Sequence, residues 1–202
     1  MSAHDMHPPI PPTPLHPPDI PALYSVGTFN ARGALNESVE DLLNKIIKLD
    51  LDYCAVQDTG KHVSPYPFLN AGYFLHFKPP AYKDKSGGLA LIVKSSLKQL
   101  ITPVDQKEQQ ISPRIWIFNS LFPTKHKIFI VYNKNTKKEI LTQLSNLRFG
   151  DYDILLGDLN SYSNPFLDFA TSSPSPRPNI AFMEKLKTHE WEDSFRALYP
   201  EK

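Results

Sequence analysis

The 202-residue sequence has one cysteine, Cys54, and neither sign of charge predominates. A single cysteine excludes an internal disulfide, and the absence of a Cys/His cluster argues against a zinc site. The 22 Lys and Arg residues against 21 Asp and Glu residues leave a net charge of +1. That balance disfavours a nucleic-acid binder that relies on overall positive charge alone.

Long apolar runs are also absent. No stretch approaches the roughly 18 uninterrupted apolar residues that indicate a membrane span. The N-terminal residues lack a basic region followed by an apolar run, so we expect no secretory signal. We therefore expect an intracellular protein, nuclear or cytoplasmic, that has no membrane partner and is not secreted.

Proline, in contrast, is abundant, and its distribution divides the chain. Eight of the 20 prolines fall between Pro8 and Pro21. Because proline fixes φ and removes a backbone donor, we expect residues 1–22 to form a disordered, proline-rich tail. Its PxxP spacings suit a groove-type domain that binds extended peptides, but such spacing arises by chance in any proline tract, so a spacer is the favoured interpretation. Residues 23–202, in a chain that is 41% hydrophobic, can bury the core of one domain.

Hydrophobic periodicity predicts strands and helices in mixed order. Alternating or continuous apolar runs predict strands over residues 24–30, 52–58, 87–93, 113–121, 127–133 and 152–158. Apolar residues at helical spacing predict helices over residues 36–49 and 180–188, with a third after a capping box formed by Thr136 and Glu139. Asn36 or Ser38 is the expected cap of the first helix. The pattern predicts an α/β or α+β layered domain.

The segment 154–160, ILLGDLN, carries the most chemical information. Asp158 and Asn160 are two positions apart, so in an extended chain their side chains point to the same side. An acceptor and a donor at the end of a buried strand suit a phosphate ester or its attacking water. A strand that ends in a turn uses the same residue types for local backbone bonds, and this segment alone leaves both interpretations open.

Other predicted strands also finish with polar residues. Asn30 ends one strand and Asp58 ends another, and their oxygen ligands suit a hard cation such as Mg²⁺. Tyr132, near the end of a further strand, has a phenol that can donate to a phosphate oxygen. Taken singly, each of these residues is more typical of a turn or a strand end than of a site.

The residues together carry a resemblance. In chain order the motifs are VGTFNARG, DYCAVQD, SGGLALIV, IFIVYNKN, ILLGDLN and EDSFRALYP. This order resembles the endonuclease/exonuclease/phosphatase superfamily, and within it the branch of apurinic and retroelement endonucleases. The resemblance runs from about Tyr24 to Pro200. It implies a DNase I-like fold, a four-layer β-sandwich flanked by helices. It also implies an Mg²⁺-dependent phosphodiester hydrolase (with Mn²⁺ as an alternative) that acts on nucleic acid, DNA in preference to RNA.

The resemblance also implies roles for the matching residues. Asp158 would activate or orient the attacking water, and Asn160 would position the phosphate. Tyr132 would contact the phosphate. Asn30 would organise the site and the surroundings of the metal, and Asp58 stands where the superfamily has a metal-binding glutamate.

A second group of residues matches the superfamily as substrate contacts. These are Asn135, in the loop after Tyr132, together with Arg32 and Arg114. Lysines in expected loops, Lys78 among them, would contact backbone phosphates or simply remain solvated.

Two departures from the superfamily pattern matter. Asp58 is one methylene shorter than glutamate, which puts a direct Mg²⁺ bond in doubt. After EDSFRALYP the superfamily has further strands and a closing Asp-His pair, and no residue before Lys202 matches that histidine. A catalytically inactive, truncated remnant that binds nucleic acid or a protein partner is therefore the alternative. An inositol-phosphate or lipid phosphatase ranks third, because Ser161 and Tyr162 follow the GDLN motif where those enzymes have an arginine.

Overall fold

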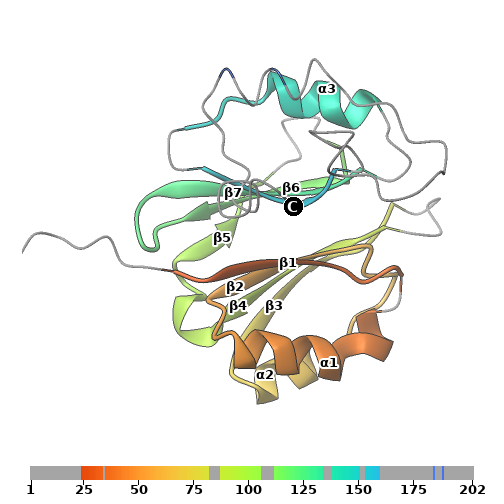
Figure 1. The fold of residues 1–202 in the computed structure, drawn as a ribbon, viewed down its shortest axis with the longest axis vertical. Coiled ribbons are helices and arrows are strands. Elements are labelled where there is room, and N and C mark those ends of the chain that lie inside the picture. The colour runs from red at the N-terminus through yellow and green to blue at the C-terminus, as the bar shows by residue number, and fades with distance from the viewer. Residues whose placement is uncertain are drawn as a thin grey trace, which may run out of the picture.

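Two sheets packed face to face, with helices on their outer sides, make up the fold (Figure 1). The computed structural model describes residues 24–33, 35–81, 87–105, 112–133, 138–150 and 153–159, together with residues 184 and 188. The layers are helix, sheet, sheet and helix. The predicted α+β class and four-layer sandwich are therefore confirmed.

The first sheet has the strand order β1-β2-β4-β3. Its strands are β1 (Val26–Asn30), β2 (Tyr53–Gln57), β3 (Tyr73–Lys78) and β4 (Leu89–Lys94). β1 and β2 are parallel and the other pairs are antiparallel. Helix α1 (Leu35–Lys48) connects the parallel pair, as a parallel pair requires a crossover.

The second sheet repeats this plan. Its strands are β5 (Ile101–Pro103), β6 (Ile115–Ser120), β7 (His126–Tyr132) and β8 (Ile154–Asp158), in the order β5-β6-β7-β8. β7 and β8 are parallel and are connected through helix α3 (Lys138–Asn146). Each sheet therefore contains one parallel pair, and the residues at the carboxyl ends of that pair lie side by side.

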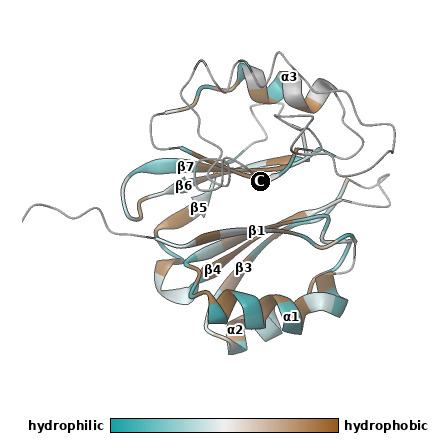
Figure 2. Ribbon diagram, viewed as in Figure 1, coloured by the Kyte–Doolittle hydropathy of each residue, from teal (hydrophilic) through white to brown (hydrophobic). Residues whose placement is uncertain are grey.

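Three apolar layers hold the structure together. The inter-sheet core lies between the two sheets and includes Tyr53, Leu91, Phe118 and Ile130, all fully buried. α1 covers the outer face of the first sheet with residues at helical spacing, namely Leu35, Val39, Leu42, Leu43 and Ile46. α3 covers the second sheet. Figure 2 shows strands that are mostly hydrophobic, whereas α1 carries both hydrophobic and hydrophilic residues.

Some elements were not predicted, and one predicted detail is wrong. Helix α2 (Tyr66–Asn70), the 3₁₀ turn η1 (Ser95–Leu97), β3 and β5 are additional elements. Neither Ser38 nor Asn36 caps α1, because the helix begins at Leu35 and both residues lie within it. The Ser38 hydroxyl donates to the Leu35 carbonyl. The Asn36 side chain donates to the His62 carbonyl at 2.8 Å and accepts from the backbone N–H of Ser64 at 3.3 Å. The residues that the structure describes include no helix long and apolar enough to cross a membrane.

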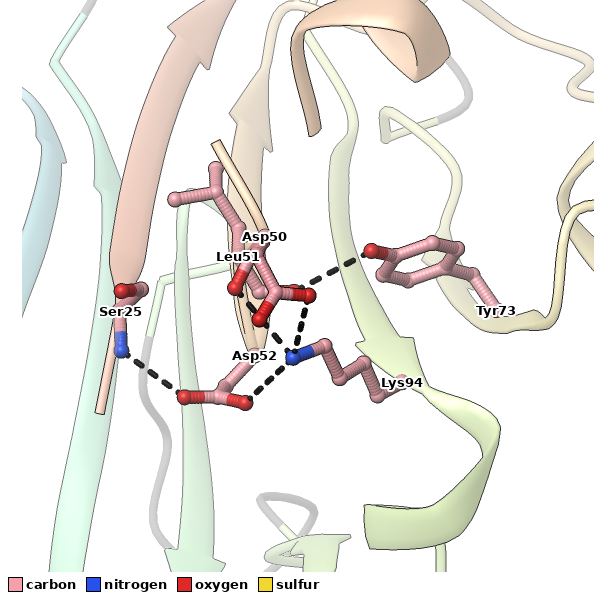
Figure 3. A network of polar contacts seen from close by, with 6 residues as sticks. All are labelled: Ser25, Asp50, Leu51, Asp52, Tyr73 and Lys94. Atoms are coloured by element: carbon pink, nitrogen blue, oxygen red, sulfur yellow. Dashed lines mark hydrogen bonds and ion pairs between the residues drawn. The ribbon is translucent and has the colours of Figure 1, made fainter. Parts of the chain in front are cut away.

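A polar network ties together the end of the first sheet where β1 and β2 begin (Figure 3). The Lys94 ammonium lies 2.9 Å from the Asp50 carboxylate and 3.0 Å from that of Asp52. The second carboxylate oxygen of Asp52 accepts from the Ser25 backbone N–H at 2.8 Å. The hydrogen bonds to the two aspartates raise the pKa of Lys94. Asp52 thus joins three segments, whereas Asp50 is largely exposed.

We expect the two aspartates to differ in their effect on stability. An asparagine at position 52 has one oxygen for two donors, so Asp52→Asn should lower the free energy of unfolding by about 1 kcal/mol. Asp50 is 87% exposed, and Asp50→Asn should cost less than about 0.5 kcal/mol. Asparagine suits this comparison because Asp50 has a φ of +49°, which asparagine tolerates. Urea unfolding checks the order, and an equal loss in both variants would contradict it.

Candidate active site at the carboxyl ends of the parallel strands

Four strand ends meet at one end of the sandwich. In the first sheet Asn30, the last residue of β1, lies opposite Gln57, the last residue of β2. In the second sheet Tyr132 and Asp158 end β7 and β8 and lie opposite each other. β1 and β8 are in contact across the sandwich. The two parallel pairs therefore present their final polar residues to a common region.

Asn30 and Asp158 join the two sheets directly. The Asn30 side-chain amide donates to Oδ2 of Asp158 at 2.7 Å, between residues 128 positions apart. The other end of the amide, Oδ1, accepts from the backbone N–H of Arg32 at 2.9 Å. Both ends of the Asn30 side chain are thus engaged, which fixes its orientation and that of the Asp158 carboxylate.

Asp58 lies deeper and has both carboxylate oxygens occupied. Only 8% of the residue is exposed. Oδ1 accepts from the backbone N–H of Gly87 at 2.6 Å, and Oδ2 accepts from the Tyr132 hydroxyl at 3.1 Å. Its φ of +52° turns the chain just after β2. Asp58 therefore connects the first sheet to β7 of the second sheet.

Tyr132 stands between the two carboxylates. Burial in the inter-sheet core, followed by the neighbouring Asp58 carboxylate, raises its pKa from 10.0 to about 12. Asp158 adds to this effect and Arg114 opposes it. The Arg114 guanidinium lies 5.6 Å from the centre of the Tyr132 ring, and the Tyr132 backbone N–H donates to the Arg114 carbonyl at 3.0 Å. The phenol proton points to Asp58 and holds the ring in place.

The backbone around Asp158 is fixed from both sides. Gly157 has a φ of +140°, and a side chain there would collide with the Val131 carbonyl of the paired strand. Asn133 is fully buried. Its backbone N–H donates to the Asp158 carbonyl at 2.8 Å, and its side chain donates to the Leu159 carbonyl at 2.9 Å. Only glycine fits at position 157, which explains the glycine that precedes the aspartate.

The structure brings together most of the described residues that the sequence singled out. Asn30, Asp58, Tyr132 and Asp158 form the connected group, and Arg114 lies against it. Arg32 contacts the group through its backbone N–H. Asn135 and Asn160 lie outside the described residues.

Lys78 is placed differently from the prediction, and two further residues, Gly87 and Asn133, contact the aspartates of the site. Lys78 belongs to strand β3 and not to a loop, and its ammonium donates to the Ile115 carbonyl at 3.0 Å. Burial lowers its pKa to about 8. The contacts of Gly87 and Asn133 with the two aspartates were not foreseen. A glycine pair before a strand and an asparagine at a strand end were the available signals, but neither indicates a partner.

The described residues contain no group of three or more His, Cys, Asp or Glu side chains able to hold a metal. Mg²⁺ prefers oxygen ligands and is commonly held by one or two carboxylates, with water and substrate oxygens completing the shell. The Asp158 carboxylate fits such a one-carboxylate arrangement. The Asp58 carboxylate fits it less well, because the residue is only 8% exposed and each of its oxygens already accepts a hydrogen bond.

The surroundings of Tyr132 lead to a spectroscopic prediction. At about pH 10.5 an exposed tyrosine is mostly ionised, whereas Tyr132 should remain protonated because its pKa is about 12. Asp58→Asn removes a negative charge that opposes the phenolate, so the pKa of Tyr132 should fall. ¹³C NMR of ring-labelled tyrosine measures this, and Tyr132→Phe assigns the signal among nine tyrosines. A Tyr132 signal that titrates with the exposed tyrosines would contradict the prediction.

Comparison with known proteins finds similar structures but no similar sequences. No family model matches the chain, and no curated protein matches its sequence. An AP endonuclease from Archaeoglobus fulgidus is similar in structure, with a TM-score of 0.66 and 15% identity over 89% of this chain and 76% of that chain. For a 3′-5′ exonuclease (NExo) from Neisseria meningitidis the TM-score is 0.63, with 15% identity over 86% of this chain and 74% of that one.

A structure of the 3′ phosphatase NExo from Neisseria bound to a product DNA hairpin also matches. Its TM-score is 0.59, with 14% identity over 89% of this chain and 76% of that chain. Taken with the order of strands, these matches show that the chain has a DNase I-like fold.

Proposed function

We propose that the chain is an Mg²⁺-dependent phosphodiester hydrolase of endonuclease type that acts on DNA. The observation that carries the proposal is the hydrogen bond of 2.7 Å between Asn30 and Asp158, which unites the two sheets where their parallel strands end. Structures with the same fold include nucleases and a phosphatase, and one of these is bound to a product DNA hairpin. That ligand belongs to the Neisseria protein and supports DNA as the substrate class here.

In this proposal Asp158 is the general base that activates the attacking water. Its carboxylate accepts a proton from the water as the water oxygen bonds to phosphorus, and the bond from phosphorus to the leaving oxygen breaks. Asn30 holds Oδ2 of Asp158 through its amide donor, so the carboxylate needs no reorientation during the reaction. Asn160 and Asn135 are assigned to phosphate positioning on the basis of the motifs alone.

Arg114 provides positive charge beside the reacting phosphate. A guanidinium suits a phosphodiester because its planar donors match the phosphate oxygens. The Tyr132 ring against which Arg114 lies is itself held by Asp58. Tyr132 therefore acts in this scheme through its ring, because its hydroxyl proton is donated to Asp58.

The Asp158 carboxylate is the group that would hold the cation, with Asn30 beside it. Mg²⁺, or Mn²⁺ in its place, would supply positive charge to stabilise the oxygen that leaves phosphorus.

A nicking assay on supercoiled DNA and on duplex DNA with an abasic site tests the proposal. Wild type should cut with Mg²⁺ and not with EDTA. Asp158→Asn keeps the shape of the side chain but removes the carboxylate that serves as base and as cation ligand, and should lower the rate by at least about 10²–10⁴-fold. Asp50→Asn, in the network at the other end of the first sheet, is the matched control and should cut like wild type.

The outcome also separates the alternative. Wild-type protein that binds DNA without Mg²⁺ and never cuts it would contradict the hydrolase and favour a binding remnant. Cleavage that survives Asp158→Asn would show that a contaminating nuclease or another site is responsible.

A further inference from the structure

The segment that follows β2 is locked by close backbone contacts. Asp58 turns the chain at a φ of +52°, and its carbonyl accepts from the Gly33 N–H at 2.6 Å. The next residues pair with the glycines that precede β4, because the Gly60 N–H donates to the Gly87 carbonyl at 3.1 Å. A side chain at Gly88 would lie 2.9 Å from the Gly60 carbonyl. The Asp58 carboxylate therefore has little room to move.

The contacts of this carboxylate are those of a buried structural acceptor. A charge-assisted hydrogen bond to a backbone N–H is short and strong, and the bond from Gly87 at 2.6 Å is of this kind. The second oxygen accepts a hydrogen bond from the Tyr132 hydroxyl at 3.1 Å. Asp58 is 8% exposed and Tyr132 is 5% exposed. A direct bond to Mg²⁺, which demands near-octahedral geometry, would have to compete with these two hydrogen bonds at a nearly buried carboxylate.

Asp58 contacts two other segments of the site, so a change at Asp58 can alter their positions. It links β2 to Tyr132, 74 residues away, and to Gly87, 29 residues away. Tyr132 in turn lies against Arg114 and opposite Asp158. A change at Asp58 is therefore transmitted to the groups that the proposed function places around the phosphate.

We propose that Asp58 is a positioning residue that holds the Tyr132 ring and the Gly87–Gly88 segment at the site, and that it does not ligate the cation. The glutamate that the superfamily resemblance implies at this position is one methylene longer. The shorter aspartate side chain hydrogen-bonds to Gly87 and Tyr132, and we infer that it does not extend to a cation. This role deepens the proposed function and rests on it for the identity of the site.

The test compares three variants without DNA, so that its result is independent of the nicking assay. Asp58→Asn removes the charge and tolerates the positive φ. Asp58→Glu keeps the charge but moves the carboxylate by one methylene. Asp158→Asn is the matched change at the proposed cation ligand. The probe is Mn²⁺ alone, followed by the electron paramagnetic resonance signal of the free ion.

Positioning predicts a clear separation of effects. Asp58→Glu should bind Mn²⁺ like wild type, and Asp58→Asn should lose only a few-fold through the lost charge. Asp158→Asn should weaken binding by at least about tenfold. Loss of Mn²⁺ binding in Asp58→Asn as large as that in Asp158→Asn, with recovery in Asp58→Glu, would overturn the proposal.

Metal-free protein provides the second measurement. Both Asp58 variants should shift the Gly87 amide proton and the Tyr132 ring signals in NMR spectra, whereas Asp158→Asn should leave the Gly87 signal in place. Asp58→Asn and Tyr132→Phe should each lower Tm by roughly 2–4 °C. The double variant should lose less than the sum. Additive losses with an unmoved Gly87 signal would overturn the proposal.

The two proposals fail in different ways. Wild-type protein that takes up no Mn²⁺ and does not cut DNA would contradict the proposed function. The Gly87 signal and the double-variant comparison would still decide the role of Asp58.

Discussion

The parallel pairing of β1 with β2 and of β7 with β8 is the constraint on which the site depends. Parallel strands end at the same edge of a sheet, so each pair places two terminal polar residues side by side. The inter-sheet core then brings the two pairs together, because burying the inner faces of both sheets is the main source of stability in such a sandwich. The site is a consequence of how the core closes.

The polar residues at the end of this core satisfy one another. Burying a polar group without a partner costs free energy, and the apolar layer ends where Asn30 meets Asp158 and where Tyr132 meets Asp58. Each pair has one member from each sheet. The contacts that satisfy the buried polar groups at the end of the core therefore also set the relative positions of the side chains in the candidate site.

Sequence reasoning located the polar strand ends well but not their partners. An alternating pattern leads into Asn30 and a continuous apolar run leads into Asp158, which predicts both at strand ends, and the structure ends β1 and β8 there. β3 was missed although Leu75–Lys78 alternates apolar and polar residues, and its polar His76 and Lys78 lie on the face that packs toward the other sheet. β5 has three residues and α2 has five, too few for any periodic pattern.

The contacts of Asp58 were beyond such reasoning for a different reason. They depend on a positive φ at Asp58 and on the register of β4 against β2, which brings Gly87 back to it. The register is not local in sequence, and the residue type at position 58 does not by itself dictate a positive φ. The motif identifies a carboxylate here, but the motif alone cannot distinguish a carboxylate that faces a ligand from one that faces a backbone N–H.

Burial is the largest cause of the raised pKa of Tyr132, and the charges around the phenol also contribute to it. Both Asp58 and Asp158 disfavour a negative charge on the phenol, and Arg114 only partly offsets them. Under the proposed function, a phosphodiester that approaches the same region carries a negative charge and would meet repulsion of the same sign. Added positive charge would offset that repulsion beside Asp158. A divalent cation held by Asp158 would provide that charge at the carboxylate that contributes to the repulsion, whereas Asp58, already engaged by Gly87 and Tyr132, could keep its structural role throughout.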